Sequence, residues 1–368
     1  MSAEAVHLEG VTKRYGALAA VDGLSLTIGR GEMVTLLGPS GCGKTTILRM
    51  IAGFVRPTSG TVSIAGTPVN DIPPHKRQVG LVFQNYALFP HMTVAENVGF
   101  GLKMRGIAKQ AARPKIDEAL EKVRLLERRD AYPRQLSGGQ QQRTALARAL
   151  VIQPDILLLD EPFGALDREL RQHMQSEMRQ LQRSLGISTL LVTHDQEEAL
   201  TLSDRIVVMN AGKVEQVGTP ADIFERPATA FVANFMGRMN LLKGQLKRQP
   251  GGHGCELALD GVEARLPMAD CESTAEGPVT VMFRPERIAT VHPSERQEAG
   301  GSHSAVLRGS VLDVNYLGAW AELKIAVSEG AGQRFTVRTS NKDDGTPPFR
   351  IGDPVDLIIP PEATYVIG

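Results

Sequence analysis

One segment constrains this chain more than any other, Gly38-Pro39-Ser40-Gly41-Cys42-Gly43-Lys44-Thr45, which matches the pattern GxxxxGK[ST]. An apolar run at 33–37 precedes it, and a helical pattern at 44–52 follows it, ending at Gly53. A strand, a glycine-rich loop and a helix in this order present backbone N–H groups to phosphate oxygens. We expect Lys44 to bind the outer phosphates and the Thr45 hydroxyl to ligate Mg²⁺.

The cysteines indicate no metal or disulfide scaffold. Cys42, Cys255 and Cys271 are unevenly spaced and form no CxxC pair, so we expect neither a zinc site nor a disulfide framework, and a reducing compartment is favoured. Within the loop, Cys42 is interpreted as a small residue that fills the turn. The alternative is a reactive thiol, because a helix N-terminus stabilises the thiolate, and thiol reagents would then block ATP binding.

Two acids end an apolar strand at 156–160. Adjacent carboxylates such as Asp160 and Glu161 are costly at the end of a buried strand unless a cation meets them. Bound to a nucleotide, Mg²⁺ would meet them, with Asp160 on the metal side and Glu161 orienting or deprotonating the attacking water. The alternative is an acidic turn before Pro162.

A second glycine-rich element, Leu136-Ser137-Gly138-Gly139-Gln140, precedes an Ala/Leu-rich helix. Ser137 suits the N-cap of that helix, and the two glycines leave N–H groups bare for a phosphate. Alone it would fit a flexible turn. Between the phosphate loop and the acidic strand, it makes the chain resemble the ABC ATPase family, whose signature is LSGGQ.

The resemblance implies roles for further residues. Tyr15 stands where that family stacks an aromatic ring on adenine, although a half-buried strand tyrosine is the alternative. Gln84 matches the glutamine that senses Mg²⁺ and water, Asp167 ends the loop Gly164-Ala165-Leu166-Asp167 that crosses between subunits, and His194 matches the histidine that contacts the γ-phosphate.

The expected cofactors are ATP and Mg²⁺. The expected catalytic residues are Glu161, His194 and Gln84, and the expected metal-binding residues are Thr45, Gln84 and Asp160. The expected nucleotide-binding residues are Tyr15, Gly38, Pro39, Ser40, Gly41, Cys42, Gly43, Lys44, Thr45, Thr46, Ser137, Gly138, Gly139, Gln140 and Asp167.

The spacing of hydrophobic residues changes along the chain. Short half-exposed strands are expected within 5–28, further strands at 61–64 and 79–83, helices within 92–150, and buried strands at 33–37, 156–160, 189–193 and 205–209. After 236, strands are expected at 279–283, 306–314, 322–325 and 355–359, with an exposed loop at 293–304. This predicts an α/β P-loop NTPase core with an antiparallel β subdomain and a helical insert, followed by a small all-β OB-like domain. The domains are 1–236, with a helical subdomain at about 88–150, and 237–368.

The resemblance also implies partners. In the family, the signature of one subunit closes over ATP held by another, so a homodimer or a paired ATPase subunit is implied, and Glu161→Gln is expected to bind ATP and hold the dimer shut. Importer ATPases present the stretch 84–98 to integral-membrane permease subunits, which receive cargo from a periplasmic or extracellular substrate-binding protein. The stretches 283–286 and 309–318 resemble the transport-associated OB-like domain, from which we expect dimer support.

Charge and hydropathy limit the class. Lys+Arg and Asp+Glu each number 41, so no nucleic-acid partner is expected. No signal peptide is expected at the N-terminus, and no apolar run approaches the roughly 20 residues of a membrane helix, so any role at a membrane is expected to be that of a peripheral subunit. The resemblance implies that this subunit lies on the cytoplasmic face of the inner membrane. The sequence of the segment from 73–77 through 89–92 resembles that of importer ATPases of the spermidine/putrescine group. Ferric iron, aminoalkylphosphonate, sulfate or sugar import remain alternatives, as do a soluble non-transport ABC ATPase and a nucleotide-binding regulator without turnover.

Overall fold

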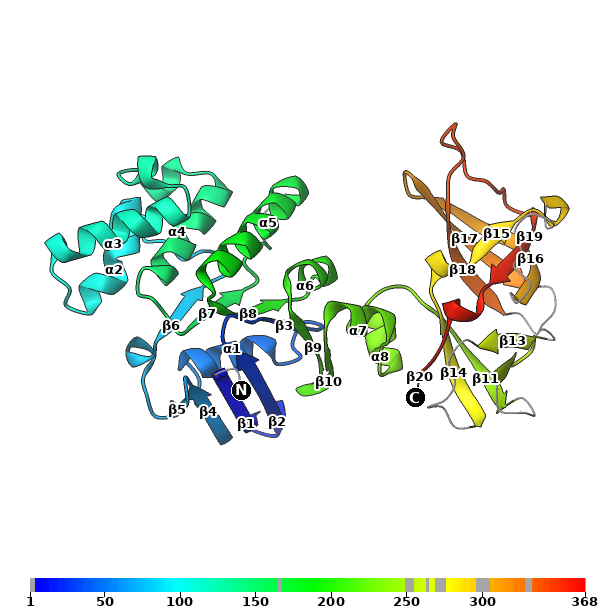
Figure 1. Cartoon of the computed structure of the whole chain (residues 1–368), viewed down its shortest axis with the longest axis horizontal. Coiled ribbons are helices and arrows are strands. Elements are labelled where there is room, and N and C mark those ends of the chain that lie inside the picture. Colours follow the sequence, from blue (N-terminus) through cyan, green and yellow to red (C-terminus); the bar gives the residue numbers. More distant parts are fainter. Residues whose placement is uncertain are drawn as a thin grey trace. The chain divides into compact units, whose positions relative to one another are not determined.

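The computed structural model describes residues 4–164, 167–248, 255–262, 265–268, 276–295, 305–327 and 333–367 (Figure 1). The chain divides into two compact units, Met1–Ile223 and Phe224–Gly368. The domain limits expected from the sequence, 1–236 and 237–368, stay a prediction. None of the helices in the described part of the chain is long and apolar enough to span a bilayer.

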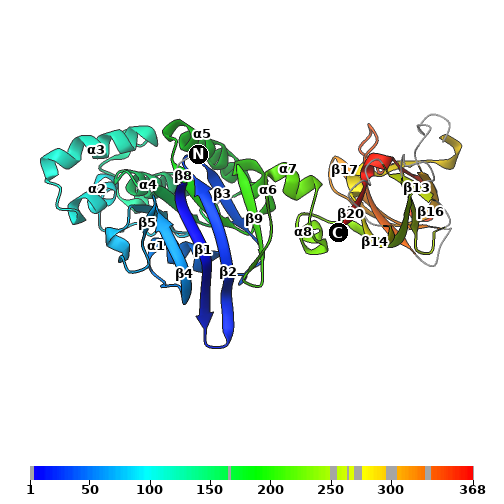
Figure 2. The same cartoon turned by 60° about the horizontal axis from the view of Figure 1, so that its bottom comes forward.

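The first unit begins with an antiparallel sheet (Figure 2). Its order is β2-β1-β4-β5, with bounds Leu18–Gly29, Glu4–Tyr15, Ser59–Ile64 and Thr67–Pro68. The expectation of short strands here is wrong, because β1 and β2 are 12 residues each. Register shifts, such as the one between Leu8 and Val11, interrupt the alternation of buried and exposed side chains, so one bulged strand resembles several short ones.

The second sheet carries the predicted buried strands. Its order is β10-β9-β3-β8-β7-β6, with bounds Lys213–Gly218, Arg205–Asn210, Met33–Leu37, Ser188–Thr193, Ile156–Asp160 and Val79–Val82. Neighbouring strands are parallel except for the β10–β9 pair. Since a parallel sheet is covered on both faces, its inner strands β3, β7 and β8 are largely buried runs without alternation of exposed and buried side chains, whereas the antiparallel edge strand β10 is partly exposed.

The pleat of this sheet sends alternate side chains to different partners. Leu158 packs with Ile47 and Ile51 of α1, Lys44–Ala52, and with the antiparallel sheet. Its neighbours Leu157 and Leu159 pack on the opposite face with Met174 and other side chains of the helices there. The loop that precedes α1 follows β3, and the acids Asp160 and Glu161 lie at the end of β7. Both therefore lie at the same edge of the sheet, where its parallel strands end.

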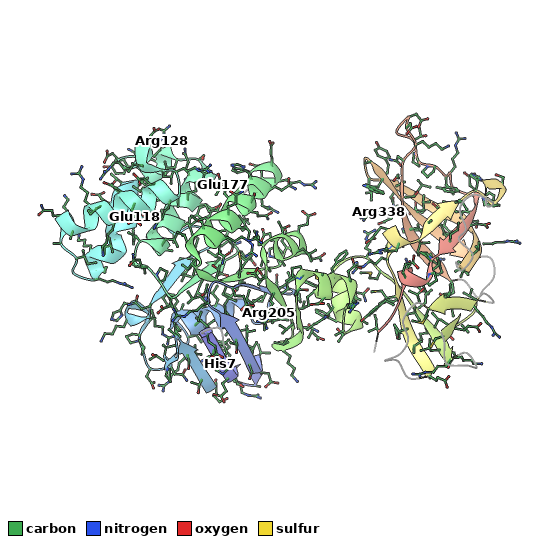
Figure 3. The ribbon with its side chains drawn as sticks, viewed as in Figure 1. His7, Glu118, Arg128, Glu177, Arg205 and Arg338 are labelled. Carbon is green, nitrogen blue, oxygen red and sulfur yellow. The ribbon has the colours of Figure 1, made fainter. Side chains whose placement is uncertain are left out.

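The helical region expected at 92–150 is confirmed. It contains α2, α3 and α4, with bounds Val94–Met104, Lys109–Lys122 and Gly138–Leu150. The remaining helices are α5, α6, α7 and α8, with bounds Arg168–Leu185, Gln196–Leu202, Pro220–Glu225 and Ala230–Phe235. Arg143 of α4 donates to Glu177 of α5 at 2.5 Å, which ties the helical region to the core (Glu177 is labelled in Figure 3).

The second unit is built from two antiparallel five-stranded sheets. The first has the order β13-β12-β11-β14-β20, with bounds Arg265–Met268, Cys255–Leu259, Asn240–Arg248, Gly277–Phe283 and Thr364–Ile367. The second has the order β15-β19-β16-β17-β18, with bounds Ala289–Val291, Pro354–Ile359, Ala305–Tyr316, Trp320–Val327 and Arg334–Ser340. Phe283 of one sheet and Phe335 of the other have ring centroids 5.9 Å apart, within one shared core.

Three further expectations concern this unit. The four expected strands are confirmed, whereas β11, β12, β13, β15, β18 and β20 were not predicted. Of the expected loop at 293–304, Pro293–Glu295 forms a 3₁₀ turn and the rest lies outside the described residues. Cys255 is disulfide-bonded, contrary to the expectation from cysteine spacing, whereas Cys42 is free and buried. Spacing is a poor guide here, because strand pairing rather than sequence distance decides which residues meet.

Candidate active site

The phosphate loop is shaped by two close backbone approaches. A Cβ at Gly43 would lie 2.3 Å from the Ala20 carbonyl oxygen, and a Cβ at Gly38 would lie 2.3 Å from that of Met209. Gly43 also has φ +107°, in the region where side chains are rarely tolerated, and it is the N-cap of α1. The loop is therefore a cradle bounded by backbone, into which successive N–H groups point without side chains in the way.

Lys44 lies within this cradle and is buried. Its Nζ donates to the carbonyl oxygens of Gly38 at 2.7 Å and Pro39 at 2.9 Å, and lies 3.7 Å from the Cys42 Sγ. The ammonium group is thus held over the loop by the loop's own carbonyls. Cys42 is buried beside it, which agrees with its interpretation as a residue that fills the turn.

The two acids at the end of β7 occupy different surroundings. Burial, followed by the negative charge of Glu161, raises the pKa of Asp160 above its ordinary value. The positive charges of Arg49 and Lys44 and a hydrogen bond with the Thr45 side chain partly offset this rise. A carboxylate that is destabilised by burial and by a neighbouring carboxylate is a favourable place for a cation. The side chain of Thr45 forms a hydrogen bond with Asp160, so its hydroxyl oxygen lies beside this candidate cation position.

Glu161 is the centre of a hydrogen-bonded group. Its Oε2 accepts from Gln84 Nε2 at 3.2 Å, and its Oε1 lies 3.0 Å from His194 Nδ1. These residues follow three neighbouring strands of the parallel sheet, β6, β7 and β8. Parallel strands end at one edge, so residues widely separated in the sequence meet there. The structure thus brings together the three residues expected to be catalytic.

The backbone around Glu161 is strained and firmly held. Glu161 has φ +46°, which is uncommon for a residue with a side chain, and its N–H donates to the Val192 carbonyl at 2.9 Å. The turn continues through Phe163, which is fully buried and anchors it in the core. Such strain fixes the direction of the carboxylate, which is required of a group that must orient a water molecule.

Neighbouring hydrogen bonds hold His194 in place. The Thr193 hydroxyl donates to Glu198, whose pKa is raised by burial, and accepts from the Asp195 N–H at 3.0 Å. Asp195 caps α6 by accepting from the N–H groups of Glu197 and Glu198. The backbone on both sides of His194 is therefore fixed, while the imidazole itself is largely exposed.

The remaining predicted residues belong to other elements. Ser137 is the N-cap of α4 and forms a capping box with Gln140, which leaves Ser137 and Gly138 exposed at the helix start. Asp167 caps α5 through the Leu170 N–H at 2.9 Å. Tyr15 is exposed at the end of β1, with the Lys13 Nζ 5.1 Å from its ring centroid. Of the loop before Asp167, residues 165–166 lie outside the described residues.

Sequence reasoning missed two arginines that act on this site. Arg49 is one helical turn from Thr45 on α1, and its positive charge partly offsets the rise in the pKa of Asp160. This spacing of four residues was a usable signal. Arg148 on α4 donates to the backbone carbonyls of Tyr86 and Ala87, which no local sequence pattern indicates.

A broad groove lies between α2 and α3. Its volume is about 970 Å³, and Phe100, Ile107 and Ile116 contribute apolar surface. The set of cations around it is Lys103, Lys109, Arg113 and Arg129, accompanied by Glu96. Within the stretch 84–98, which the resemblance implies is presented to a permease, His91 lines the groove, whereas Tyr86 is buried in the core of the first unit and is not available.

Comparison with known families gives two matches. A family model described as ABC transporter matches residues 21–164, and one described as TOBE domain matches residues 281–367. The chain is 46% identical over 353 residues to the spermidine/putrescine import ATP-binding protein PotA of Nitratidesulfovibrio vulgaris, covering 96% of this chain and 94% of the relative. It is 44% identical over 369 residues to the protein of the same description from Pseudomonas fluorescens, covering 99% of this chain and 98% of the relative.

Solved structures resemble the first part of the chain. The dimeric post-hydrolysis state of the ATP-binding cassette MJ0796, bound to ADP and Pi, is 34% identical with a TM-score of 0.52, covering 58% of this chain and 98% of that structure. CbiO1 of Clostridium perfringens, part of the ABC transporter complex cbiONQ, is 28% identical with a TM-score of 0.56, covering 60% of this chain and 90% of that structure.

Proposed function

Because this chain belongs to the ABC transporter family of ATP-binding proteins, we propose that it is the ATP-hydrolysing subunit of an importer, acting as a dimer on a separate permease. The observation that carries the proposal is the group formed by Glu161, Gln84 and His194 beside the phosphate loop. A chain that only bound nucleotide would need the loop but would not need these three side chains to converge.

ATP binds in this proposal at the loop and α1. The N–H groups of Gly41 to Thr46 and the Lys44 ammonium surround the phosphates, and Tyr15 contacts the adenine. Mg²⁺ fits the donors present, because the Thr45 hydroxyl and a crowded Asp160 carboxylate are oxygen ligands of the kind that it prefers. Gln84 completes this set. When bound, Mg²⁺ would neutralise charge on the phosphate oxygens.

Glu161 orients the attacking water in this proposal. The water oxygen forms a bond to the γ-phosphorus as the bond to the ADP oxygen breaks, and the water proton leaves towards the Glu161 carboxylate. His194 and Gln84 hold that carboxylate by its two oxygens. In this proposal His194 would also contact the γ-phosphate. The partner subunit would supply the exposed start of α4, Ser137 to Gln140, to the same nucleotide, and Asp167 would lie at that interface.

The substitution Glu161→Gln tests this assignment. It keeps the size and one acceptor oxygen but removes the negative charge, so hydrolysis should fall by about 10²- to 10⁴-fold while ATP still binds. Sedimentation in ATP should then show a stable dimer. Glu9→Gln, at an exposed position of β1, is the matched control and should hydrolyse ATP normally. Undiminished hydrolysis in Glu161→Gln would contradict the assignment.

The groove between α2 and α3 is the proposed permease dock. It combines an apolar floor with a cationic rim, which suits a short permease segment that has an apolar face and acidic residues. Through this contact the chain would lie on the inner face of the cell membrane, with a substrate-binding protein on the opposite face. Co-purification of membrane subunits, lost on replacing Ile116 with Glu, tests the placement. Retention of those subunits would refute it.

We propose polyamines as the cargo, because relatives aligned over nearly the whole chain are named for spermidine and putrescine import. Cargo does not contact this subunit, so the test is uptake by cells whose only copy is Glu161→Gln. Loss of putrescine and spermidine uptake alone supports the proposal. Loss of ferric iron, aminoalkylphosphonate, sulfate or sugar uptake instead would keep the motor and replace the cargo.

A further inference from the structure

The connection from β6 to α2, residues 83–93, joins the candidate active site to the groove. At one end Gln84 donates to Glu161. At the other end Met92 lines the groove, and Asn97 of α2 holds the connection in place. The side chain of Asn97 is fully buried, accepts from the Phe89 N–H at 2.8 Å, and donates to the carbonyls of Phe89, Met92 and Thr93.

The middle of this connection has an unfavourable backbone. Tyr86 has φ +60° and Ala87 has φ +46°, and both carry a Cβ. Consecutive residues of this kind rarely adopt the left-handed region unless other contacts hold them there. The Tyr86 ring is buried in the core of the first unit, whereas Ala87 is exposed. The carbonyls of these two residues therefore need a partner from another element.

Arg148 is that partner. Its Nη2 donates to the Tyr86 carbonyl at 2.8 Å and its Nη1 to the Ala87 carbonyl at 2.7 Å. Its guanidinium carbon also lies 5.7 Å from the centroid of the Phe89 ring. One planar group thus contacts three residues of the connection at once, with a fork of donors that no other side chain provides.

The position of Arg148 gives these contacts a consequence. It lies on α4, the helix whose N-cap is Ser137. Phe89 in turn packs against Phe100 of α2, with ring centroids 4.5 Å apart, and Phe100 contributes to the groove. A continuous series of contacts therefore runs from the Glu161 carboxylate through Gln84 to the strained pair, and from there to α4 and to the groove.

We propose that Arg148 is a positioning residue that couples the nucleotide site to the groove between α2 and α3, by holding the connection 83–93 against α4. Burial lowers the pKa of its guanidinium, and an arginine side chain stays protonated in proteins. The inference rests on the proposed function for the meaning of the groove. The contacts themselves do not depend on which partner occupies it.

The test measures coupling without a permease. Amide hydrogen exchange is followed by mass spectrometry over residues 84–104, with and without saturating Mg²⁺ and a non-hydrolysable ATP analogue, in the full chain. In the wild type, the analogue should change exchange in this segment. Arg148→Met should bind the analogue with an affinity within about fivefold of the wild type, yet lose at least about half of that change in exchange.

Two further variants separate positioning from a general loss of structure. Arg148→Lys keeps the charge and one donor group and should restore part of the response, and it serves as the test variant if Arg148→Met does not fold. Arg105→Met is the matched control, because Arg105 also donates to a backbone carbonyl, that of Ile152, and to Gln78, without touching the connection. It should respond like the wild type.

The outcomes are decisive in either direction. A wild-type response in Arg148→Met, an equal loss in Arg105→Met, or no response of the wild-type segment to the analogue would each overturn the role of Arg148. None of these measurements involves a permease or a cargo. A failure of the proposed importer function would instead appear as missing co-purification or unchanged uptake, so the two failures are distinguishable.

Discussion

Arg77 is the residue whose replacement should most reduce the stability of the first unit. The side chain is buried, and burial lowers the pKa of its guanidinium. Its Nη1 donates to the carbonyls of Met50 and Ile51, both at 2.7 Å, at the C-terminal end of α1. Its Nε donates to Ile72 at 2.8 Å and its Nη2 to Val69 at 2.5 Å.

The magnitude follows from these contacts. Arg77→Met keeps most of the apolar stem but leaves buried carbonyls without a donor, which costs about 1–3 kcal/mol for each group left unpaired. The Met50 carbonyl retains the Gly53 N–H and the Val69 carbonyl retains the Ile72 N–H, so the Ile51 and Ile72 carbonyls are the two that lose their donor. The substitution also removes the cost of burying a charge. The expected loss of unfolding free energy is about 2–4 kcal/mol. For a unit of this size, the melting temperature should fall by about 4–16 °C.

Scanning calorimetry of the full chain is the assay. The transition that rises on addition of Mg²⁺-ATP identifies the first unit, since a ligand stabilises the unit that binds it. Arg56→Met is the matched control, because Arg56 forms only an exposed ion pair with Asp71 at 2.6 Å and should cost less than about 1 kcal/mol. If Arg77→Met melts within about 2 °C of the wild type, the reasoning about unpaired carbonyls is refuted.

Three further outcomes are expected. Gly43→Ala should weaken ATP binding at least about tenfold in equilibrium titrations, because the new Cβ adds backbone strain and lies 2.3 Å from the Ala20 carbonyl oxygen. Gly41→Ala, which has open space around its Cβ, should weaken binding less, and equal losses in the two variants would contradict the role of the close contact at Gly43. Burial raises the pKa of Glu198, so its contribution to stability is present below the unfolded pKa and is lost as pH rises through the folded pKa. Glu198→Gln should therefore gain stability relative to the wild type in urea titrations as pH rises above about 4, and a constant difference would count against this. Alkylation of Cys42 should be slow, because the thiol is buried, and once complete should abolish ATP binding, while Cys42→Ser stays active in the same reagent; full activity after complete alkylation sinks this expectation.

The sequence was most informative where function depends on local backbone shape. The phosphate loop needs glycines at fixed positions between a strand and a helix, so its pattern is visible without tertiary structure. The same holds for Ser137 and Gln140, because a capping box is a contact between residues three apart. The continuous apolar strands were equally visible, since burial on both faces removes any polar alternation.

The sequence was less informative where strands are bulged or bordered by polar residues. Six strands of the second unit were missed, among them β18, whose apolar face carries only Phe335 and Val337 before Thr339 ends the alternation. The length of β1 was underestimated for a related reason, because bulges shift the side-chain period. Such strands form because neighbouring strands supply hydrogen bonds and a shared core, which are properties of the assembled sheet.

The sequence by itself determined the cradle for phosphate, the buried parallel strands with helices between them, and the identity of the chemical groups at the candidate site. Only the tertiary structure decided that Glu161 accepts from both Gln84 and His194, and that Arg148 holds Tyr86 and Ala87. The physical reason is the distance along the sequence over which each effect acts. Glycine geometry, capping and periodicity act over a few residues, whereas contacts between side chains on different strands and helices exist only after the parallel sheet has aligned their ends.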